Sequence, residues 1–232
     1  MSTPFASRAA VGAAEERTFL RGVFQWMLLA VLLSTAVAVY LDRTTDVVGY
    51  FEDHGGAMFA LFGVQIGLVL ALSAAIGRLS ATAATALFAA YAFTVGVTFS
   101  VLLGVYTTSS MVGAFAGAAG LFGGMAAWGH ATERDLSGWG TVLFGAVCGI
   151  FVASIANVFV GGDALSFVIG IAGVVVFSAL TAYDIQKLKR MASAGFASDD
   201  DRHKATIIGA LQLYLDFVNL VISLLRIFGA RR

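Results

Sequence analysis

Two aspartates lie inside apolar runs of this chain, where a charged group is costly. Asp184 follows Thr-Ala-Tyr near the end of one run, and Asp216 lies within Leu-Gln-Leu-Tyr-Leu-Asp-Phe-Val-Asn-Leu of the next. A charged side chain at the centre of a bilayer costs about 2.5–3.5 kcal/mol on insertion scales, so such groups usually face the protein interior or water. The two aspartates therefore predict a functional site within the apolar part of the chain.

Two neighbouring carboxylates suit the binding of cations and of protons. Carboxylate oxygens are the hard ligands that Ca²⁺ prefers, and repulsion between two like charges opposes their simultaneous ionisation. We therefore expect a site that senses pH and takes Ca²⁺ as a bound or transported ion, with protons competing for the same oxygens. The alternative is structural, in which a protonated aspartate holds helices together by hydrogen bonds.

The residues around the second aspartate argue against catalysis. Intramembrane aspartyl proteases also place Tyr-Asp on one helix and an aspartate on the next, but their second motif is Gly-x-Gly-Asp and a Pro-Ala-Leu element follows it. Here Leu213, Tyr214 and Leu215 precede Asp216, and the single proline is Pro4. The one cysteine and the three histidines share no ligand spacing. We expect neither enzyme activity nor a cofactor other than an ion.

The composition indicates an integral membrane protein. Of the 232 residues, 59% are hydrophobic and 12% are charged, whereas a soluble domain carries roughly 25% charged residues. Helices that span a bilayer are predicted for residues 23–41, 57–77, 83–105, 111–129, 141–160, 164–185 and 206–228. The expected fold class is all-α: a domain of seven transmembrane helices over 23–229, with an N-terminal tail over 1–22 and a C-terminal tail over 230–232.

The positions of lysine and arginine favour a cytoplasmic N-terminus. That orientation leaves ten of them on the cytoplasmic side and four outside, in agreement with the positive-inside rule. Three arginines near the C-terminus do not follow the rule: Arg226, Arg231 and Arg232. Seven full spans put them outside, whereas a re-entrant last run returns them to the cytoplasm. The formal net charge is zero and provides no basic field for nucleic acid, so the expected partners are the lipid bilayer and other membrane proteins.

The predicted topology brings both aspartates and one arginine to the same end of the bundle. The sixth run ends on the cytoplasmic side and the seventh begins there, so a hairpin joins the two helices. Asp216 lies about 15 Å into its helix and Asp184 about one turn from the end of its own, so their depths agree loosely. Arg78, at the cytoplasmic end of the second run, is a candidate latch that contacts Asp184 while that carboxylate is ionised.

Polar residues form stripes on three of the predicted helices. Gln212, Asp216, Asn219, Ser223 and Arg226 are spaced by four, three, four and three residues, which places them on one helix face. Lipid cannot satisfy such a face, so it points to other helices or to water, and the seventh helix is expected to be central. The residues that could line a path are Gln212, Asn219, Ser223, Tyr91, Thr94, Thr98 and Thr181. Interhelical hydrogen bonding is the alternative for the shorter stripes.

Two other patterns concern packing and the surface. In the fourth run, pairs of glycines lie four residues apart, a spacing that lets helices approach closely in lipid; they are Gly113 with Gly117 and Gly120 with Gly124. The charged segment 186–205 is interpreted as a solvated loop, with partner docking as the alternative.

Several segments together resemble the Bax inhibitor-1 (transmembrane Bax-inhibitor-motif) family. They are Thr181-Ala-Tyr-Asp-Ile-Gln-Lys-Leu-Lys189, Gly209-Ala-Leu-Gln-Leu-Tyr-Leu-Asp-Phe-Val-Asn-Leu220 and Leu225-Arg-Ile-Phe-Gly229. The segments Tyr106-Thr-Thr-Ser-Ser-Met and Glu133-Arg-Asp-Leu-Ser-Gly-Trp-Gly140 look like the bacterial inner-membrane branch of that family. The resemblance extends from the first apolar run to the end of the chain.

The resemblance implies six helices around the last one and a pH-sensitive Ca²⁺ leak governed by a di-aspartyl pair. Asp184 and Asp216 match that pair. Arg78 matches the arginine that latches onto the first aspartate, but more loosely, because Ala-Ile-Gly-Arg-Leu-Ser lacks the basic cluster of some members. Eukaryotic members are tied to suppression of cell death and some bacterial members to regulation of a membrane protease. The implied location is the inner membrane of a bacterium.

Two functions of different kinds remain open. In the first, the protein is a Ca²⁺ channel or leak that the aspartates gate. In the second, it is a stress-linked interaction protein that regulates other membrane proteins, such as a membrane protease, and has no conductance of its own. Ca²⁺ flux through the purified protein in liposomes discriminates between them.

Overall fold

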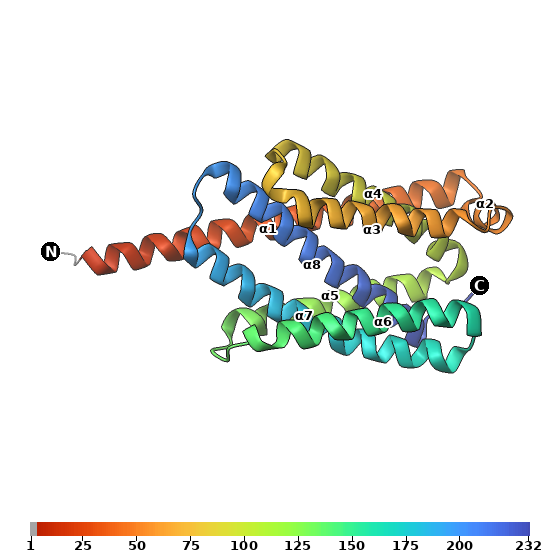
Figure 1. Ribbon diagram of the computed structural model, residues 1–232. Coiled ribbons are helices and arrows are strands. Elements are labelled where there is room, and N and C mark those ends of the chain that lie inside the picture. Colours follow the sequence, from red (N-terminus) through yellow and green to blue (C-terminus); the bar gives the residue numbers. More distant parts are fainter. Residues whose placement is uncertain (1–3) are drawn as a thin grey trace. The chain divides into compact units, whose positions relative to one another are not determined.

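The computed structural model describes residues 4–232, with side chains placed from residue 14 onward, and this part of the chain is almost entirely helical (Figure 1). Residues 1–3 of the predicted tail lie outside the described residues. The α-helices are α1 (Pro4–Thr44), α2 (Val47–Asp53), α3 (Ala57–Ala75), α4 (Ala81–Val105), α5 (Thr108–Ala131), α6 (Gly140–Val160), α7 (Asp163–Ala194) and α8 (Asp199–Phe228). Two 3₁₀ helices, η1 (Ile76–Arg78) and η2 (Ser137–Trp139), join them.

Seven helices among the described residues are long and apolar enough to cross a membrane. They cover Ala14–Thr44, Ala57–Arg78, Ala81–Val105, Thr108–Ala131, Ser137–Val160, Asp163–Ala194 and Asp199–Phe228. Each predicted run falls inside one of them, and no strand occurs within residues 4–232. The predicted fold class, an all-α protein with seven membrane-spanning helices, is confirmed. The division into tails and membrane domain stays a prediction, although α1 already begins at Pro4.

The interpretation of segment 186–205 as a solvated loop is wrong. α7 continues to Ala194 and α8 begins at Asp199, so the chain leaves the helix only briefly. Gly195 takes a φ of +78° there, a conformation that glycine adopts without strain at a helix end. Ser198 caps α8, because its Oγ accepts a hydrogen bond of 3.1 Å from the Asp201 amide. Most charged residues of this segment therefore lie in helical turns that continue α7 and α8 beyond their apolar spans.

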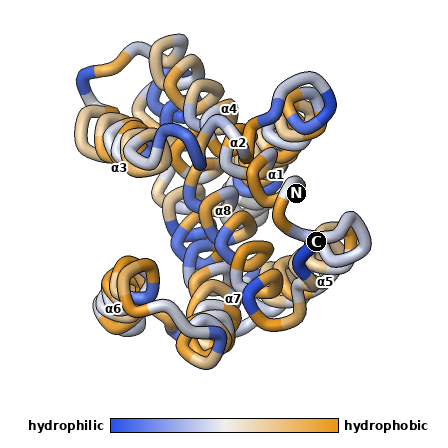
Figure 2. The backbone as a smooth tube through the Cα atoms, turned by 90° about the vertical axis from the view of Figure 1, so that its right-hand side faces the viewer, coloured by the Kyte–Doolittle hydropathy of each residue, from blue (hydrophilic) through white to orange (hydrophobic). Residues whose placement is uncertain are grey.

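α8 is by far the most buried of the seven spans. In the most apolar stretch of α8, 72% of the residues are buried, whereas the corresponding share in the other spans lies between 6% and 39%. Hydrophilic residues recur along its tube, while the tube of α6 is mostly hydrophobic (Figure 2). A helix that carries polar residues and is screened from its surroundings is what the predicted central position requires.

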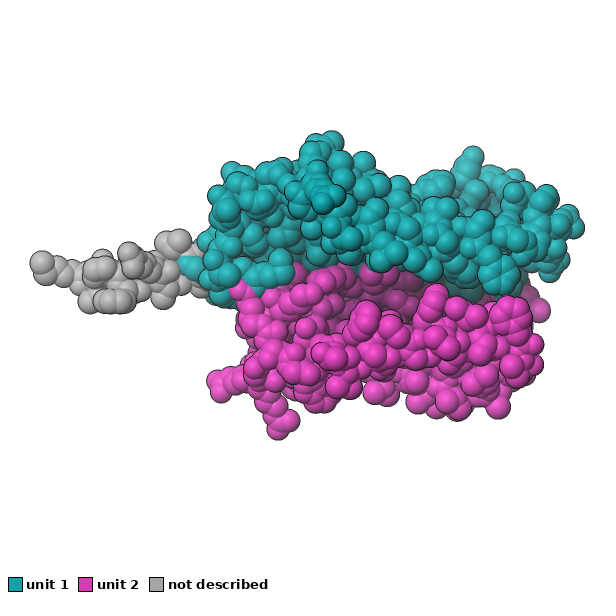
Figure 3. Space-filling view, in the orientation of Figure 1, with its two compact units in different colours: residues 1–105, 191–211 teal, residues 106–190, 212–232 magenta. Residues whose placement is uncertain are grey.

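The chain divides into two compact units, which are coloured separately in Figure 3. Unit 1 consists of residues 1–105 and 191–211, and unit 2 consists of residues 106–190 and 212–232. α7 and α8 contribute to both units. Both aspartates belong to unit 2, and the candidate latch Arg78 belongs to unit 1.

Unit 1 is built on the packing of α1 against α4. Gly96 of α4 allows the two helices to approach closely: a Cβ atom there would lie 2.8 Å from the backbone oxygen of Ser34 and 2.7 Å from the Cβ of Val37, both in α1. The first part of α8 packs in the same unit, where the Thr85 Oγ1 and the His203 Nε2 lie 3.0 Å apart. Glycine at this contact allows two helix backbones to approach closely.

Close helix contacts in unit 2 occur at glycines other than those expected. A Cβ atom at Gly129 of α5 would lie 2.7 Å from the Cα of Ala182 in α7, and one at Gly173 of α7 would lie 3.1 Å from the Cβ of Ser223 in α8. The four predicted glycines of α5 behave differently. Only Gly117 meets a neighbour, at 3.2 Å from a Leu224 methyl carbon, and added Cβ atoms at the other three would have no atom within 4 Å. The predicted close approach is therefore wrong at Gly113, Gly120 and Gly124.

The end of the chain returns to the start of α5. Tyr106 and Arg231 form an antiparallel β-bridge, and the Thr107 amide donates a 2.9 Å hydrogen bond to the Ala230 oxygen. At the opposite end of α5, the Lys189 ammonium donates a 2.6 Å hydrogen bond to the His130 oxygen. α8 is one uninterrupted helix of 30 residues, long and apolar enough for a full span.

Candidate functional site

Asp184 of α7 and Asp216 of α8 form the candidate site in unit 2. Their exposed fractions are 7% and 4%, and the charge of Asp184 acts electrostatically on Asp216. The Asp216 Oδ2 is shielded from solvent and has no hydrogen-bond partner among the described residues. A buried carboxylate oxygen without a partner is costly, so this atom is suited to receive a proton or a cation.

The packing of two antiparallel helices sets the relative depth of the aspartates. Gly173 lies opposite Ser223, and Asp216 precedes Ser223 by two helical turns. The same distance along α7 leads to the level of Leu180, about one turn short of Asp184. The carboxylates are therefore staggered by roughly 6 Å along the helices, at 1.5 Å per residue, which is a separation that two side chains can bridge.

The polar stripe of α8 faces the protein, as the spacing predicts. None of its five residues is exposed. The Arg226 Nη1 donates a 2.9 Å hydrogen bond to the Ser154 Oγ of α6, and the Asn219 amide donates one of 2.8 Å to the Leu215 oxygen of its own helix. The Gln212 Oε1, one turn before Asp216, is buried and has no hydrogen-bond partner within the described chain. Two adjacent polar side chains of this stripe therefore carry an oxygen free to bind a ligand.

The candidate lining residues of α7 and α4 make hydrogen bonds within helices or between them. The Thr181 hydroxyl donates to the Phe177 oxygen at 2.8 Å. In unit 1, the Thr94 hydroxyl donates to the Tyr91 oxygen at 2.7 Å. Both bonds lie within a single helix, so neither of them is the hydrogen bond between helices that is the alternative for these stripes.

Gln65 of α3 is a polar residue that the sequence pattern did not single out. Its amide donates to the Thr94 oxygen at 3.0 Å and to the Thr98 hydroxyl at 2.9 Å. These two bonds join α3 to α4 within unit 1. A lone glutamine in an apolar span, facing a threonine stripe on the next span, is the signal that could have revealed the pair.

Arg78 ends η1 in unit 1, and its side chain is exposed. The latch contact between Arg78 and Asp184 remains a prediction.

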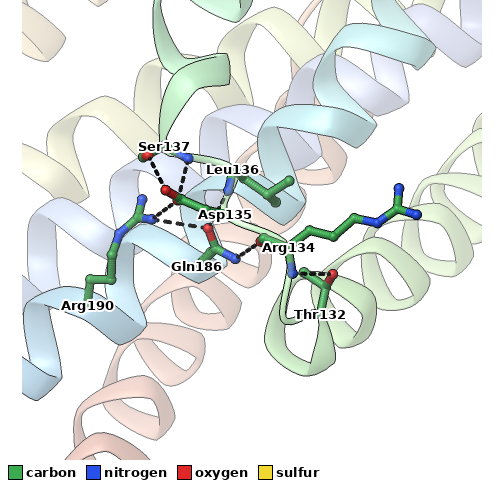
Figure 4. A network of polar contacts seen from close by, with 7 residues as sticks. All are labelled: Thr132, Arg134, Asp135, Leu136, Ser137, Gln186 and Arg190. Carbon is green, nitrogen blue, oxygen red and sulfur yellow. Dashed lines mark hydrogen bonds and ion pairs between the residues drawn. The ribbon is translucent and has the colours of Figure 1, made fainter.

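A second polar cluster in unit 2 joins the loop between α5 and α6 to the last turns of α7 (Figure 4). The Gln186 Oε1 accepts a 2.8 Å hydrogen bond from the Leu136 amide, and its Nε2 donates one of 2.7 Å to the Arg134 oxygen. The Arg190 Nη1 lies 3.1 Å from both the Gln186 Oε1 and the Asp135 Oδ1. Together with the bond from Lys189 to the His130 oxygen, we call these contacts the loop clamp.

Asp135 is the only carboxylate of the loop clamp, and it is held in its ionised form. The amide and the hydroxyl of Ser137 both donate to it, at 2.9 and 2.8 Å. These bonds, followed by the nearby Arg190 guanidinium, lower the pKa of Asp135 from its usual value. Asp135 therefore keeps its charge throughout the neutral pH range.

The sequence profile of one protein family, described as inhibitor of apoptosis-promoting Bax1, matches residues 16–232. The chain belongs to the Bax inhibitor-1 family. Inner membrane protein YbhL of Escherichia coli is 42% identical over 217 residues, which cover 93% of each chain. An uncharacterized protein of Deinococcus radiodurans is 41% identical over 215 residues, covering 93% of this chain and 91% of its own. One of Borreliella burgdorferi is 36% identical over 214 residues, covering 92% of each.

The oxygen atoms around the pair limit how this family member could hold an ion. No cluster of three or more histidine, cysteine, aspartate or glutamate side chains suited to a metal occurs in the described part of the chain. Ca²⁺ takes six to eight oxygen ligands, so two carboxylates and a neutral amide oxygen fit weak, transient binding rather than storage. Weak binding is what an ion path needs, because an ion held too tightly does not leave.

Proposed function

We propose that this Bax inhibitor-1 family protein is a pH-sensitive Ca²⁺ leak of the bacterial inner membrane, with a cytoplasmic N-terminus. Asp184 and Asp216 form its ion-binding and pH-sensing pair, and Arg78 is the latch. The observation that carries the proposal is the buried Asp216 Oδ2, which lacks a hydrogen-bond partner among the described residues and lies near a second carboxylate. The inner-membrane location is carried over from the name of the Escherichia coli relative.

The proposed mechanism is a competition for the carboxylate oxygens. When both aspartates are ionised, their charges attract Ca²⁺, and an Arg78 contact with Asp184 holds the path closed. Protonation of Asp184 removes the partner of Arg78 and releases the latch. The same proton weakens the attraction for Ca²⁺, so the flux reflects the balance of the two effects. The side-chain oxygen atoms of Gln212, Asn219 and Ser223 in the polar stripe of α8 replace part of the hydration shell of the ion.

The test is Ca²⁺ uptake by liposomes that contain the pure protein, measured between about pH 5 and pH 8. We expect Asp184→Asn and Asp216→Asn to change the flux and flatten its pH dependence, and Arg78→Ala to raise the flux at neutral pH. Asp163→Asn is the matched control, because Asp163 is an exposed aspartate at the other end of α7. Arg134→Ala controls for the loss of one basic charge in a short connection.

A flux no greater than that of empty liposomes, from protein shown to be folded, would overturn the proposal. The function would then be that of a stress-linked interaction protein that regulates other membrane proteins. In that case the aspartates would affect the shape of the protein without carrying ions.

A further inference from the structure

The loop clamp joins two segments, and the leak mechanism gives no role to the contact between them. One is Glu133-Arg-Asp-Leu-Ser-Gly-Trp-Gly140, and the other is the Tyr-Asp-Ile-Gln segment that ends at Gln186. Besides the hydrogen bonds, Tyr183 lies against the start of α6: a Cβ atom at Gly140 would be 3.0 Å from the Cζ of Tyr183. The residues on both sides of Asp184 are therefore held by the loop and by the first turn of α6.

Gln186 is the central residue of the loop clamp. Its side-chain oxygen accepts from the Leu136 amide and from Arg190, and its side-chain nitrogen donates to the Arg134 oxygen. Two of these partners are backbone groups, so the contact does not depend on which side chains the loop carries. Leu136 is itself buried, at 6% exposed, which anchors the loop next to this amide pair.

The loop clamp holds α7 on the side that faces away from the aspartate pair. An α-helix has 3.6 residues per turn, so Gln186 and Arg190 lie about 200° and 240° around the axis from Asp184. Any rotation of α7 that turns Asp184 toward or away from Asp216 must move Gln186 by the same angle. Such a rotation would stretch or break short hydrogen bonds of defined direction.

We propose that Gln186 is a positioning residue for the aspartate pair, and that it fixes the rotation of α7 by holding the backbone of the loop at Arg134 and Leu136. Arg190, which contacts both Gln186 and Asp135, keeps the amide in this orientation. The inference rests on the proposed function for its effect on flux, but the geometric coupling stands without it. The loop after α5 thereby controls the orientation of Asp184 toward Asp216.

The test compares variants that differ in one property of residue 186. Gln186→Leu keeps a side chain of similar size but removes all three hydrogen bonds. Gln186→Glu keeps the acceptor for the Leu136 amide and Arg190, and replaces the donor to the Arg134 oxygen by a second acceptor. We expect Gln186→Leu to change the flux at a fixed Ca²⁺ concentration by about fivefold or more, the lower range of coupling between sites, and to shift its pH profile. Gln186→Glu should restore much of the wild-type profile.

The matched control lies in the same loop. Arg134→Ala removes an exposed side chain but leaves the backbone oxygen that Gln186 contacts, so its flux and pH profile should equal those of the wild type. Arg190→Ala removes the same charge from within the loop clamp and should act in the direction of Gln186→Leu. It replaces Gln186→Leu if that variant fails to fold.

A second readout separates this inference from the leak itself. Because coupling is reciprocal, Asp184→Asn should change hydrogen exchange of the Leu136 amide by about fivefold or more, whereas Asp163→Asn should not. If the aspartate variants alter flux but Gln186→Leu loosens the loop and leaves flux unchanged, the positioning role is overturned and the leak stands. If no variant alters flux, the leak fails, and the exchange of the Leu136 amide alone decides for or against positioning.

Discussion

Unit 1 and unit 2 both place polar side chains between apolar helices, but they satisfy them differently. In unit 1, both hydrogen bonds of the Gln65 amide end on α4, at Thr94 and Thr98. In unit 2, Asp216 and Gln212 each leave a buried oxygen without a hydrogen-bond partner among the described residues. An amide with hydrogen-bond partners holds helices together. A buried carboxylate oxygen without a partner destabilises the protein, and a bound ligand can remove this free-energy penalty.

The difference shows why a polar stripe alone does not reveal a function. The stripes on α4 and α8 have the same helical spacing, and each lies among apolar residues. What separates them is whether each polar atom has a partner. The stripe of α4 is therefore best understood as a structural contact, and the stripe of α8 as a candidate site.

The largest expected effect is the contrast between a site residue of unit 2 and the structural amide of unit 1. Asp216→Asn should lower Ca²⁺ flux about tenfold, because the amide that replaces the carboxyl group cannot ionise and the ion loses one of its two carboxylates. Gln65→Leu should leave the pH dependence of the flux unchanged. Flux assays on both variants in liposomes check this. An equal loss in the two variants would remove the distinction between the units.

The next effect concerns the packing that brings α5 and α7 together in unit 2. Gly129→Ala should lower the free energy of unfolding by about 1–3 kcal/mol, because the added methyl group meets the backbone of Ala182, which cannot move as a side chain can. Gly113→Ala, on the same helix, should be neutral or stabilising by up to about 1 kcal/mol, since its methyl group meets no atom. Unfolding in mixed detergent micelles measures both, and similar values would refute the close contact.

A smaller effect should follow from removing the interhelical amide of unit 1. Gln65→Leu should destabilise the protein by about 0.6–2 kcal/mol, the range for hydrogen bonds between membrane helices. The reason is that the Thr98 hydroxyl and the Thr94 oxygen lose their donor. Thr98→Val should give a similar loss, and the double variant should cost less than the sum of the two. Strict additivity in this double-mutant cycle would show that the bond contributes nothing.

The smallest effect is the pH response of the loop clamp. The lowered pKa of Asp135 means that its ionised form stabilises the folded loop above the usual aspartate pKa of about 3.9, and that this contribution disappears as pH falls below that value. Asp135→Asn should therefore speed exchange of the Ser137 amide at pH values of about 5 and above, and the difference from wild type should shrink in stronger acid. A wild-type transition within the neutral range would contradict the assignment.

Much of the architecture follows from the sequence because length and apolarity decide it. Seven long apolar runs specify seven helices that can cross a bilayer, and the 4-3-4-3 spacing specifies which face of α8 is polar. The charges of segment 186–205 suggest a solvated loop, although the Ser-Asp-Asp-Asp cap before Arg202 is a helix-start signal. Where a helix continues beyond its apolar span, helix caps and helical propensity decide whether the chain stays helical, and the presence of charged residues does not.

The sequence by itself determined the membrane class, the number of spans, the family and the two aspartates, since each depends on residue type and spacing. Only the tertiary structure decided that the Asp216 Oδ2 is left without a partner, that Gln65 is satisfied by α4, and that Gly129 and Gly173 are the close contacts. It also revealed the loop clamp, in which the contacts between the loop and α7 join residues that are fifty or more positions apart in the chain. The physical reason is that hydrogen-bond satisfaction and backbone approach depend on which helices become neighbours, and periodicity within one helix carries no information about its neighbour.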